Sequence, residues 1–180
     1  MLTYVTMTYR PATEAERPAI ITLLEQATLL TDDLPNDLST FRLVFANEKL
    51  AGVAGLEILG ENGLLRSVAV SPDFRNQSVG NQLVGAIIGL AESNRITMLY
   101  LITTTADLYF ERLGFSRVDR TNVPDTIAQT RQFSELCPAS AVVMYKSSEA
   151  PASELNQLIS PKLELRTTWS HETNPCSLHG

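Results

Sequence analysis

The sequence predicts a mixed α/β domain in which a central sheet of about seven strands is flanked by helices. Three observations favour this fold class. Seven short segments are apolar and rich in β-branched or aromatic residues, which is typical of strands. Helix signals occupy several of the stretches between them. The chain has 180 residues, of which 44% are hydrophobic and 19% charged, so we expect one core.

The first half predicts one helix and four strands. A strand is expected at 3–9, where β-branched and aromatic residues alternate with others. Thr13 and Glu16 form a capping-box pattern that opens a helix over 13–30, with Pro18 near its first turn. A loop and a helical turn at 37–40 then lead to strands at 41–46, 50–59 and 64–70. The Gly-Glu-Asn-Gly sequence at 60–63 indicates a hairpin turn.

The second half alternates helices with strands. Residues 80–94 carry apolar side chains on one helical face, and 97–103 is an apolar segment typical of a buried strand. A short helix over 106–113 is expected to end at Gly114, followed by a strand at 115–119. A helix at 125–136 and a strand at 141–145 complete the order.

The pattern weakens after Ser147. Residues 147–153 have the composition of a linker, and the segment that follows shows no sustained apolar period. We therefore expect one domain over 1–147 and a flexible extension over 148–180.

Charge and composition exclude several classes of partner. The formal net charge of −6 argues against binding to nucleic acid or to an anionic membrane. The longest apolar run, at 83–91, is much shorter than the roughly 20 residues of a membrane-spanning helix. No signal peptide is visible in the first ten residues, and two cysteines are too few for a disulfide scaffold. A cytoplasmic location is the expectation.

The two histidines, His171 and His179, both fall in the last ten residues. The predicted domain therefore lacks an imidazole for a Ser–His–Asp or Cys–His site and lacks histidine ligands for zinc. We expect no metal site, and chemistry carried by carboxylates, hydroxyls, backbone groups or a cofactor.

The segment 64–81 is the most informative part of the chain. A buried strand ends there, a tight loop follows, and a helix begins at Gly80. Free N–H groups at the start of a helix favour a pyrophosphate, and the small residues Ser78 and Gly80 let phosphates approach the main chain. An ordinary strand–loop–helix turn, in which the glycine serves packing alone, is the alternative. Neither a Walker loop nor a Rossmann Gly-x-Gly-x-x-Gly pattern is present.

This segment resembles the acetyl-CoA motif of the GNAT superfamily of N-acetyltransferases, Arg/Gln-x-x-Gly-x-Gly/Ala after a strand ending in Val-x-Pro. Arg75 takes the first position and Gly80 the last, while Ser78 replaces the first glycine and Asn76 stands where a glycine is frequent. Residues 108–115, Leu-Tyr-Phe-Glu-Arg-Leu-Gly-Phe, resemble the short helix of the superfamily that ends in Gly-Phe. The order of elements agrees from residue 3 to residue 146.

The resemblance implies a GNAT-type fold, acetyl-CoA as co-substrate and direct attack of a bound amine on the thioester. The residues it implies for the cofactor are Val68, Ala69, Val70, Arg75, Asn76, Gln77, Ser78, Val79, Gly80 and Asn81. Residues 102–106 are similar to N-acetylglutamate synthases, and 133–141 to acetyltransferases associated with arsenic-resistance operons. Both similarities imply a small amino-acid-like amine as acceptor.

The catalytic residues are less defined. Many relatives have a tyrosine as general acid where this chain has Phe110, and the neighbouring Tyr109 points about 100° away on a helix. Glu57 is the candidate base. The alternative is a cross-strand ion pair, because a two-residue turn at 61–62 would place Glu57 directly opposite Arg66.

The acceptor is expected between the loop after the first helix, the end of the fifth strand and the last strand. The candidate residues for binding it are Asp32, Asp33, Thr104, Arg131 and Ser140, with Cys137 at the border. The aspartates would recognise a cationic amine, or else be solvated. Arginines hold the glutamate carboxylates in the synthases, whereas Asp32 and Pro138 stand at comparable places here, so glutamate is not the expected acceptor.

The leading hypothesis is an acetyl-CoA-dependent N-acetyltransferase for a small amino-acid-like amine, working as a monomer or homodimer. Acetylation of protein or peptide N-termini is one alternative. A non-catalytic acyl-CoA-binding module is the other, favoured by Phe110, Leu64 and Ser78 at positions where relatives carry other residues.

Overall fold

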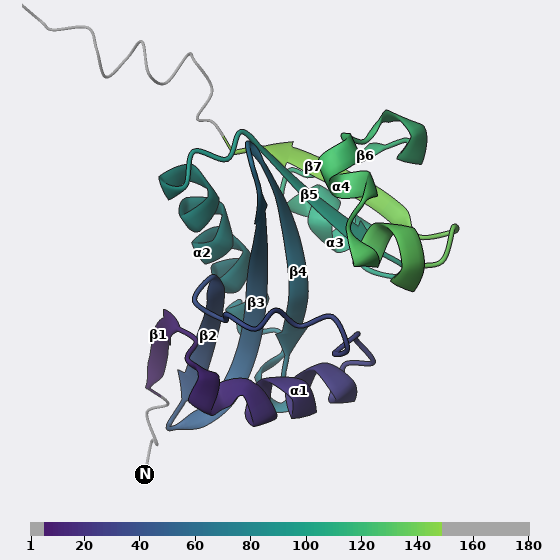
Figure 1. The fold of residues 1–180 in the computed structure, drawn as a ribbon. Helices are drawn as coiled ribbons and strands as arrows, with labels where there is room; N and C mark the ends of the chain where they lie inside the picture. The colour runs from purple at the N-terminus through teal and green to yellow at the C-terminus, as the bar shows by residue number, and fades with distance from the viewer. Residues whose placement is uncertain (1–5, 149–180) are drawn as a thin grey trace, which may run out of the picture. The chain divides into compact units, whose positions relative to one another are not determined.

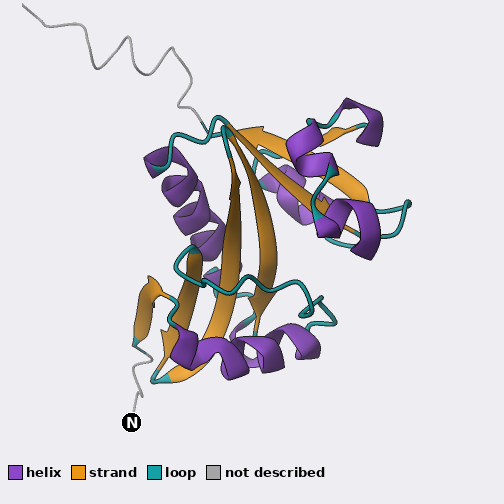
Figure 2. Cartoon of the chain, in the orientation of Figure 1, coloured by secondary structure: helices purple, strands orange, loops and turns teal. Residues whose placement is uncertain are grey.

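The computed structural model describes residues 6–148, which belong to the first of two units, Met1–Glu149 and Ala150–Gly180. Its strands are β1 Met7–Pro11, β2 Phe41–Ala46, β3 Lys49–Leu59, β4 Asn62–Val70, β5 Met98–Thr103, β6 Ser116–Val118 and β7 Val142–Ser147. Its helices are α1 Arg17–Gln26, α2 Val79–Ser93, α3 Asp107–Arg112 and α4 Asp125–Ala128. Short 3₁₀ turns lie at Glu14–Glu16, Pro72–Phe74 and Arg120–Asn122, and a π-helical turn at Gln132–Leu136. Figure 2 shows these classes of structure along the chain.

The seven described strands form one mixed sheet in the order β1-β2-β3-β4-β5-β7-β6. Only β4 and β5 run parallel, and they pair over three residues, Asn62–Leu64 with Met98–Tyr100. Beyond that point the two strands diverge (Figure 1). The edge of β4 that faces β5 is therefore unpaired from Leu65 onward, and its backbone groups are available to a ligand.

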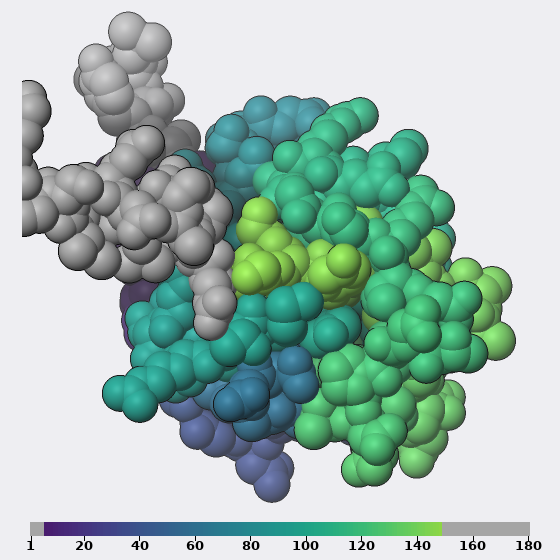
Figure 3. Space-filling view, turned by 90° about the horizontal axis from the view of Figure 1, so that it is seen from above, coloured from purple at the N-terminus to yellow at the C-terminus, as the bar shows by residue number. Residues whose placement is uncertain are grey.

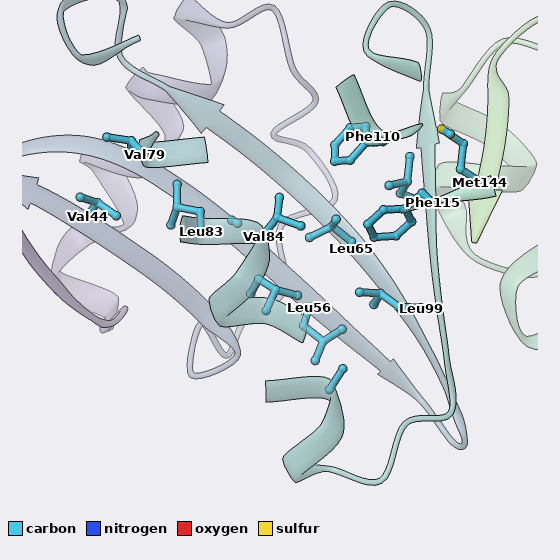
Figure 4. Packing of buried hydrophobic residues seen from close by; sticks show 14 of the residues in the cluster. Val44, Leu56, Leu65, Val79, Leu83, Val84, Leu99, Phe110, Phe115 and Met144 are labelled. Carbon is cyan, nitrogen blue, oxygen red and sulfur yellow. The ribbon is translucent and has the colours of Figure 1, made fainter. Parts of the chain in front are cut away.

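Helices cover both faces of the sheet, because successive residues of a strand point to opposite sides. Val44 and Leu65 pack on one face against α2 and against Phe110 of α3 (Figure 4). The neighbouring residues Leu43 and Leu64 point to the other face, where α1 and α4 lie. The apolar side chain patterns of the strands thus define the two cores.

The structure differs from the expected helices in two places. The helix expected over 13–30 is a 3₁₀ turn followed by α1, which ends at Gln26, and Thr28 has a left-handed φ of 57°. The helix expected over 125–136 is divided into α4 and the π-helical turn. The turn expected at 37–40 is present as a bend that closes with the N–H of Phe41 donating to the carbonyl of Leu38.

The predicted turn of the β3–β4 hairpin was wrong by one residue, which shifts each cross-strand pair by two residues. Leu59 pairs with Asn62, so the turn residues are Gly60 and Glu61 rather than 61–62. Gly60 has a φ of 70°, which costs glycine little because it has no Cβ. Glu57 consequently faces Leu64, and Arg66 faces Gly55.

The end of β7 is fixed to the segment before β5. Ser148 donates its N–H to the carbonyl of Thr97 at 3.0 Å and its hydroxyl to the carbonyl of Ile96. Seen from above, the yellow end of β7 lies against this teal segment (Figure 3). The rest of the extension expected over 148–180 lies outside the described residues. Within residues 6–148 no helix combines the length and the apolar character needed to cross a membrane.

Candidate active site

A β-bulge in β4 bends the centre of the site. Val53 pairs with Ala69 and Gly55 with Arg66, so Ser67 and Val68 together oppose a single residue of β3. Ser67 has a φ of 55°, and its hydroxyl is buried without a hydrogen-bond partner in the described part of the chain. A bulge increases the bend of its strand, and here β4 leaves β5 just before it.

The opening between β4 and β5 contains a cavity of about 470 Å³. This volume is within the range of small-molecule sites. Its wall comes from four segments: 27–30 after α1, 65–70 of β4 with Arg75, 101–106 of β5 with Phe110, and Gln132 with 136–138 before β7. Arg66 and Arg75 are the two charged residues among them.

A second cavity of about 440 Å³ adjoins the first and lies at the start of α2. Val68, Val70 and Arg75 line both cavities. The remaining wall of the second cavity consists of Phe74, Asn76, Ser78, Val79, Gly80, Asn81 and Tyr109. The first N–H groups of α2 have no acceptor within the helix, and the side chain of the N-cap residue Ser78 accepts none of them.

The loop before α2 uses left-handed backbone at two non-glycine residues, Asn76 with φ 59° and Ser78 with φ 62°. Glycine adopts this conformation without a steric penalty, which is the reason that glycines suit such a loop. Asn76 and Ser78 therefore preserve the backbone of the expected motif in spite of their side chains.

Gly80 and Tyr109 meet across the second cavity. A Cβ at Gly80 would lie 2.8 Å from the Tyr109 hydroxyl, which donates a hydrogen bond of 3.0 Å to Oδ1 of Asn81. Burial raises the pKa of Tyr109. The phenol thus belongs to the α2 end of the site, whereas its neighbour Phe110 lines the first cavity.

Arg66 places a buried guanidinium in the wall of the first cavity. Its side chain is 3% exposed, and Nη1 donates to Oε2 of Glu57 at 3.2 Å. Nη2 lies 2.6 Å from Oδ1 of Asp33, whose side chain is also 3% exposed. This contact is an ion pair, and Nε and Nη2 of Arg66 and both oxygens of Asp33 are buried without a hydrogen-bond partner among residues 6–148.

The predicted cofactor residues lie together. Val68, Ala69, Val70 and Arg75 line the first cavity, and Asn76, Ser78, Val79, Gly80 and Asn81 line the second. Gln77 lines neither, and its amide donates to the carbonyl of Asp73 at 3.2 Å.

The predicted acceptor residues are dispersed. Thr104 and Cys137 line the first cavity, and burial raises the pKa of the Cys137 thiol, with the charge of Asp33 adding to the increase and that of Arg120 opposing it. Asp33 contacts Arg66 instead of solvent. Asp32, Arg131 and Ser140 line neither cavity, and Arg131 pairs with Glu135 at 3.4 Å on the surface.

Sequence reasoning missed the role of Arg66 in the cavity, although it predicted an ion pair of this residue with Glu57. The pair is present, but it is diagonal, because Glu57 faces Leu64 in the register. An arginine inside an otherwise apolar strand was the signal that such reasoning had at its disposal.

The comparison with known sequences identifies the family. Residues 6–115 match the acetyltransferase (GNAT) family. The chain belongs to this family. Membership in this family implies N-acetyl transfer with acetyl-CoA as the co-substrate. The fold and the family expected from the sequence are both confirmed.

Two relatives illustrate how far the similarity extends. An amino-acid acetyltransferase of Pasteurella multocida (strain Pm70) is 28% identical over 127 residues, which cover 66% of this chain and 29% of the relative. The amino-acid acetyltransferase of Escherichia coli (strain K12) is 28% identical over 116 residues, which cover 61% of this chain and 26% of the relative. The chain thus spans less than a third of the length of these relatives.

Solved structures share the fold. N-acetylglutamate synthase from Neisseria gonorrhoeae, complexed with coenzyme A and N-acetyl-glutamate, superimposes with a TM-score of 0.71 at 21% identity, over 82% of this chain and 36% of that chain. A Mycobacterium tuberculosis protein in complex with CoA gives a TM-score of 0.64 at 20% identity, over 78% of this chain and 98% of that chain.

The second cavity fits the diphosphate of acetyl-CoA. Free N–H groups at the start of α2, the lack of a side chain at Gly80 and the guanidinium of Arg75 together suit a bound anion. The unpaired edge of β4 suits the amide groups of an extended pantetheine arm, because such an edge offers N–H and C=O groups in sequence.

Proposed function

We propose that this chain transfers the acetyl group of acetyl-CoA to the primary amine of a small amino-acid-like molecule. The observation that carries the proposal is the buried guanidinium of Arg66 in the wall of the first cavity, with Nε left without a hydrogen-bond partner among the described residues. A donor of this kind suits an oxygen of the acceptor, such as a carboxylate. The names of the relatives, amino-acid acetyltransferases, support the same class.

The division of labour follows from the walls of the two cavities. Residues 76 and 78–81, with Arg75, would hold the diphosphate, and the unpaired edge of β4 at Val68–Val70 would hold the pantetheine. Acetyl-CoA supplies a thioester whose carbonyl carbon accepts an amine directly. Backbone N–H groups of β4 would polarise that carbonyl, and the protein otherwise supplies orientation, which is worth several kcal/mol.

Phe110 and Tyr109 limit the acid–base roles that side chains of the site can play. Phe110, which has no proton to give, lines the first cavity, while the Tyr109 hydroxyl is engaged with Asn81 beside the diphosphate loop. We therefore assign no tyrosine as general acid. Glu57 is paired with Arg66 and lines neither cavity, so we propose it as an ion-pair partner, with the role of general base as the alternative.

A thiol-release assay with acetyl-CoA and a panel of amines tests the proposal. We expect release of CoA with free amino acids and none with peptides, under conditions in which acetyl-CoA binds. Release with peptides alone would replace the proposal with N-terminal acetylation. Binding of acetyl-CoA without release for any amine would favour an acyl-CoA-binding module. We also propose a cytoplasmic location, because the chain has only two cysteines.

A further inference from the structure

The charges around Arg66 are unbalanced. One guanidinium contacts two carboxylates, Asp33 at 2.6 Å and Glu57 at 3.2 Å, so the cluster carries one surplus negative charge. Arg66 and Asp33 are both 3% exposed, and little water separates this charge from the cavity that Arg66 lines. Charges in such a place interact strongly, because the surroundings screen them weakly.

No other fixed cation is available to the acceptor in the wall of this cavity. Arg75 also lines the cavity that we assign to the diphosphate, and a diphosphate would offset its charge. Arg120 lines neither cavity and lies 4.1 Å above the ring of Phe133, donating to the carbonyl of that residue. An acceptor in the first cavity therefore meets Arg66 together with the two carboxylates behind it.

We propose that Asp33 is a specificity-determining residue, which neutralises Arg66 and restricts the acceptor to α-amino acids of net zero charge. The inference rests on the proposed function and names the acceptor class of that site. The carboxylate of a zwitterionic amino acid would lie against Arg66, whose buried Nε has no hydrogen-bond partner among residues 6–148, and its ammonium group would be drawn by the surplus negative charge. A second carboxylate on the acceptor would be repelled by the same surplus negative charge, because no further cation is there to pair with it.

The part of the cavity wall that would face the side chain of the acceptor is apolar or uncharged, which suits an acceptor without a charged side chain. Leu29, Leu30, Leu136 and Pro138 are apolar, and Thr28, Gln132 and Cys137 are uncharged. Burial raises the pKa of the Cys137 thiol in this wall, and the charges of Arg120, which opposes the increase, and of Asp33, which adds to it, both reach this thiol. Asp33 acts on the acceptor through Arg66, so it is a positioning residue rather than a catalytic one.

Glutamine and glutamate are the matched acceptors that test the proposal, because they have nearly the same shape and differ by one charge. With the full chain and saturating acetyl-CoA, kcat/KM should favour glutamine over glutamate by about tenfold or more. Asp33→Asn should reduce this preference by about tenfold, because it removes the surplus charge. Asp33→Glu should restore most of it.

Asp37→Asn is the matched control. It removes the same charge from the same loop, but Asp37 accepts hydrogen bonds of 2.8 Å from the N–H and hydroxyl of Ser39, whereas Asp33 contacts Arg66 at 2.6 Å. Its ratio of glutamine to glutamate should equal that of the unmodified protein. Glu57→Gln is the second variant, for use if Asp33→Asn does not fold. It should also reduce the ratio of kcat/KM for glutamine to kcat/KM for glutamate. A common loss of rate cancels in this ratio.

The outcomes separate the inference from the proposed function. Transfer to glutamate at least as fast as to glutamine in the unmodified protein, or an unchanged ratio in the Asp33→Asn and Glu57→Gln variants, would overturn the inference and leave acetyl transfer intact. Failure to acetylate any amine would overturn the proposed function. Calorimetric titration of glutamine and glutamate into the CoA-bound protein would still decide the inference, since equal affinity or no binding of either contradicts it.

Discussion

At the scale of single residues, Gly80 gives the sharpest test of the cofactor site. A side chain there would occupy space only 2.8 Å from the Tyr109 hydroxyl, at the start of α2 where an anion is expected. Gly80→Glu adds both bulk and a negative charge to that space. We expect the affinity for acetyl-CoA, measured by calorimetry, to fall by about a hundredfold or more, because phosphate and carboxylate would compete for the same N–H groups.

Gly85→Glu serves as the control for this change. Gly85 is an exposed residue of the same helix, and a Cβ built on it meets nothing within 4 Å. The variant alters the net charge equally and should bind acetyl-CoA as the unmodified protein does. Equal affinity in the Gly80→Glu variant would remove the diphosphate assignment.

Glu57 and Arg66 form the second test at this scale. If Glu57 is a general base, Glu57→Gln should lower kcat by roughly 10²–10⁴-fold with the fold intact. If it serves only as partner of Arg66, the rate should change by a few-fold and stability should fall. We expect the ion-pair outcome, because the carboxylate lies within 3.2 Å of Nη1 and does not line either cavity.

A double-mutant cycle with Arg66→Met separates the two roles. For an ion pair, the loss of unfolding free energy in the double variant should be smaller than the sum of the single losses. For a base, the rate defect of Glu57→Gln should persist in the double variant. A thousandfold loss of kcat in Glu57→Gln alone would contradict our expectation.

At the scale of elements, the apolar periodicity of the sequence predicted the strands and α2, but not the turn of the β3–β4 hairpin or the bulge in β4. The seven strands and α2 were predictable because their apolar residues recur with the periods of strand and helix. The hairpin at 60–63 contains two glycines, and either a 60–61 or a 61–62 turn fits its sequence. Only the packing of β3 on β4 selects the first.

The cavity illustrates the same limit. The bulge at Ser67 and Val68 leaves no mark in the sequence, since serine rarely adopts the φ of 55° that it has here. The loop before α2 was predictable because its residues from Arg75 to Gly80 follow the motif that the sequence resembles. The wall of the first cavity was predictable only in part. The loop after α1, the end of β5 and Cys137 were expected, whereas residues 65–67 and Gln132 are brought to it by the tertiary fold alone.

The start of α1 gives a prediction with a defined pH dependence. Glu16 accepts hydrogen bonds from Arg10 at 2.7 Å and from the N–H and hydroxyl of Thr13. The bond from Arg10, and then those from Thr13, lower the pKa of Glu16 to about 2. Because the folded-state pKa is depressed, the stabilisation is present above the unfolded value of about 4.3 and is lost as pH falls towards 2.

Gln at position 16 keeps an acceptor for the N–H of Thr13 but removes the ion pair with Arg10, so Glu16→Gln should cost about 1 kcal/mol of unfolding free energy at pH 7. The difference between the two proteins should shrink between pH 4 and about 2, as Glu16 becomes protonated. Urea unfolding across this range is the measurement. A difference for Glu16→Gln that stays constant across this pH range would contradict the assignment.

At the scale of the whole molecule, the position of the domain boundary, expected after residue 147, depends on whether Ser148 belongs to the folded domain. Ser148 is 4% exposed, and its hydrogen bonds to Ile96 and Thr97 extend the pairing of β7 beside β5. Removal of Ser148 would leave the carbonyl of Ile96 without its hydrogen-bond donor. We propose that the folding unit ends at residue 148 or 149 rather than at 147.

Two truncated chains decide this point. The chain that ends after Glu149 should melt at the temperature of the full-length protein and retain its affinity for acetyl-CoA. The chain that ends after Ser147 loses two hydrogen bonds, each worth about 0.5–1.5 kcal/mol, and should melt several degrees lower. Both should unfold cooperatively, because the core lies within residues 12–144. Equal melting temperatures of the two truncated chains would show that Ser148 contributes nothing, whereas a large fall on cutting after Glu149 would mean that residues 150–180 stabilise the domain.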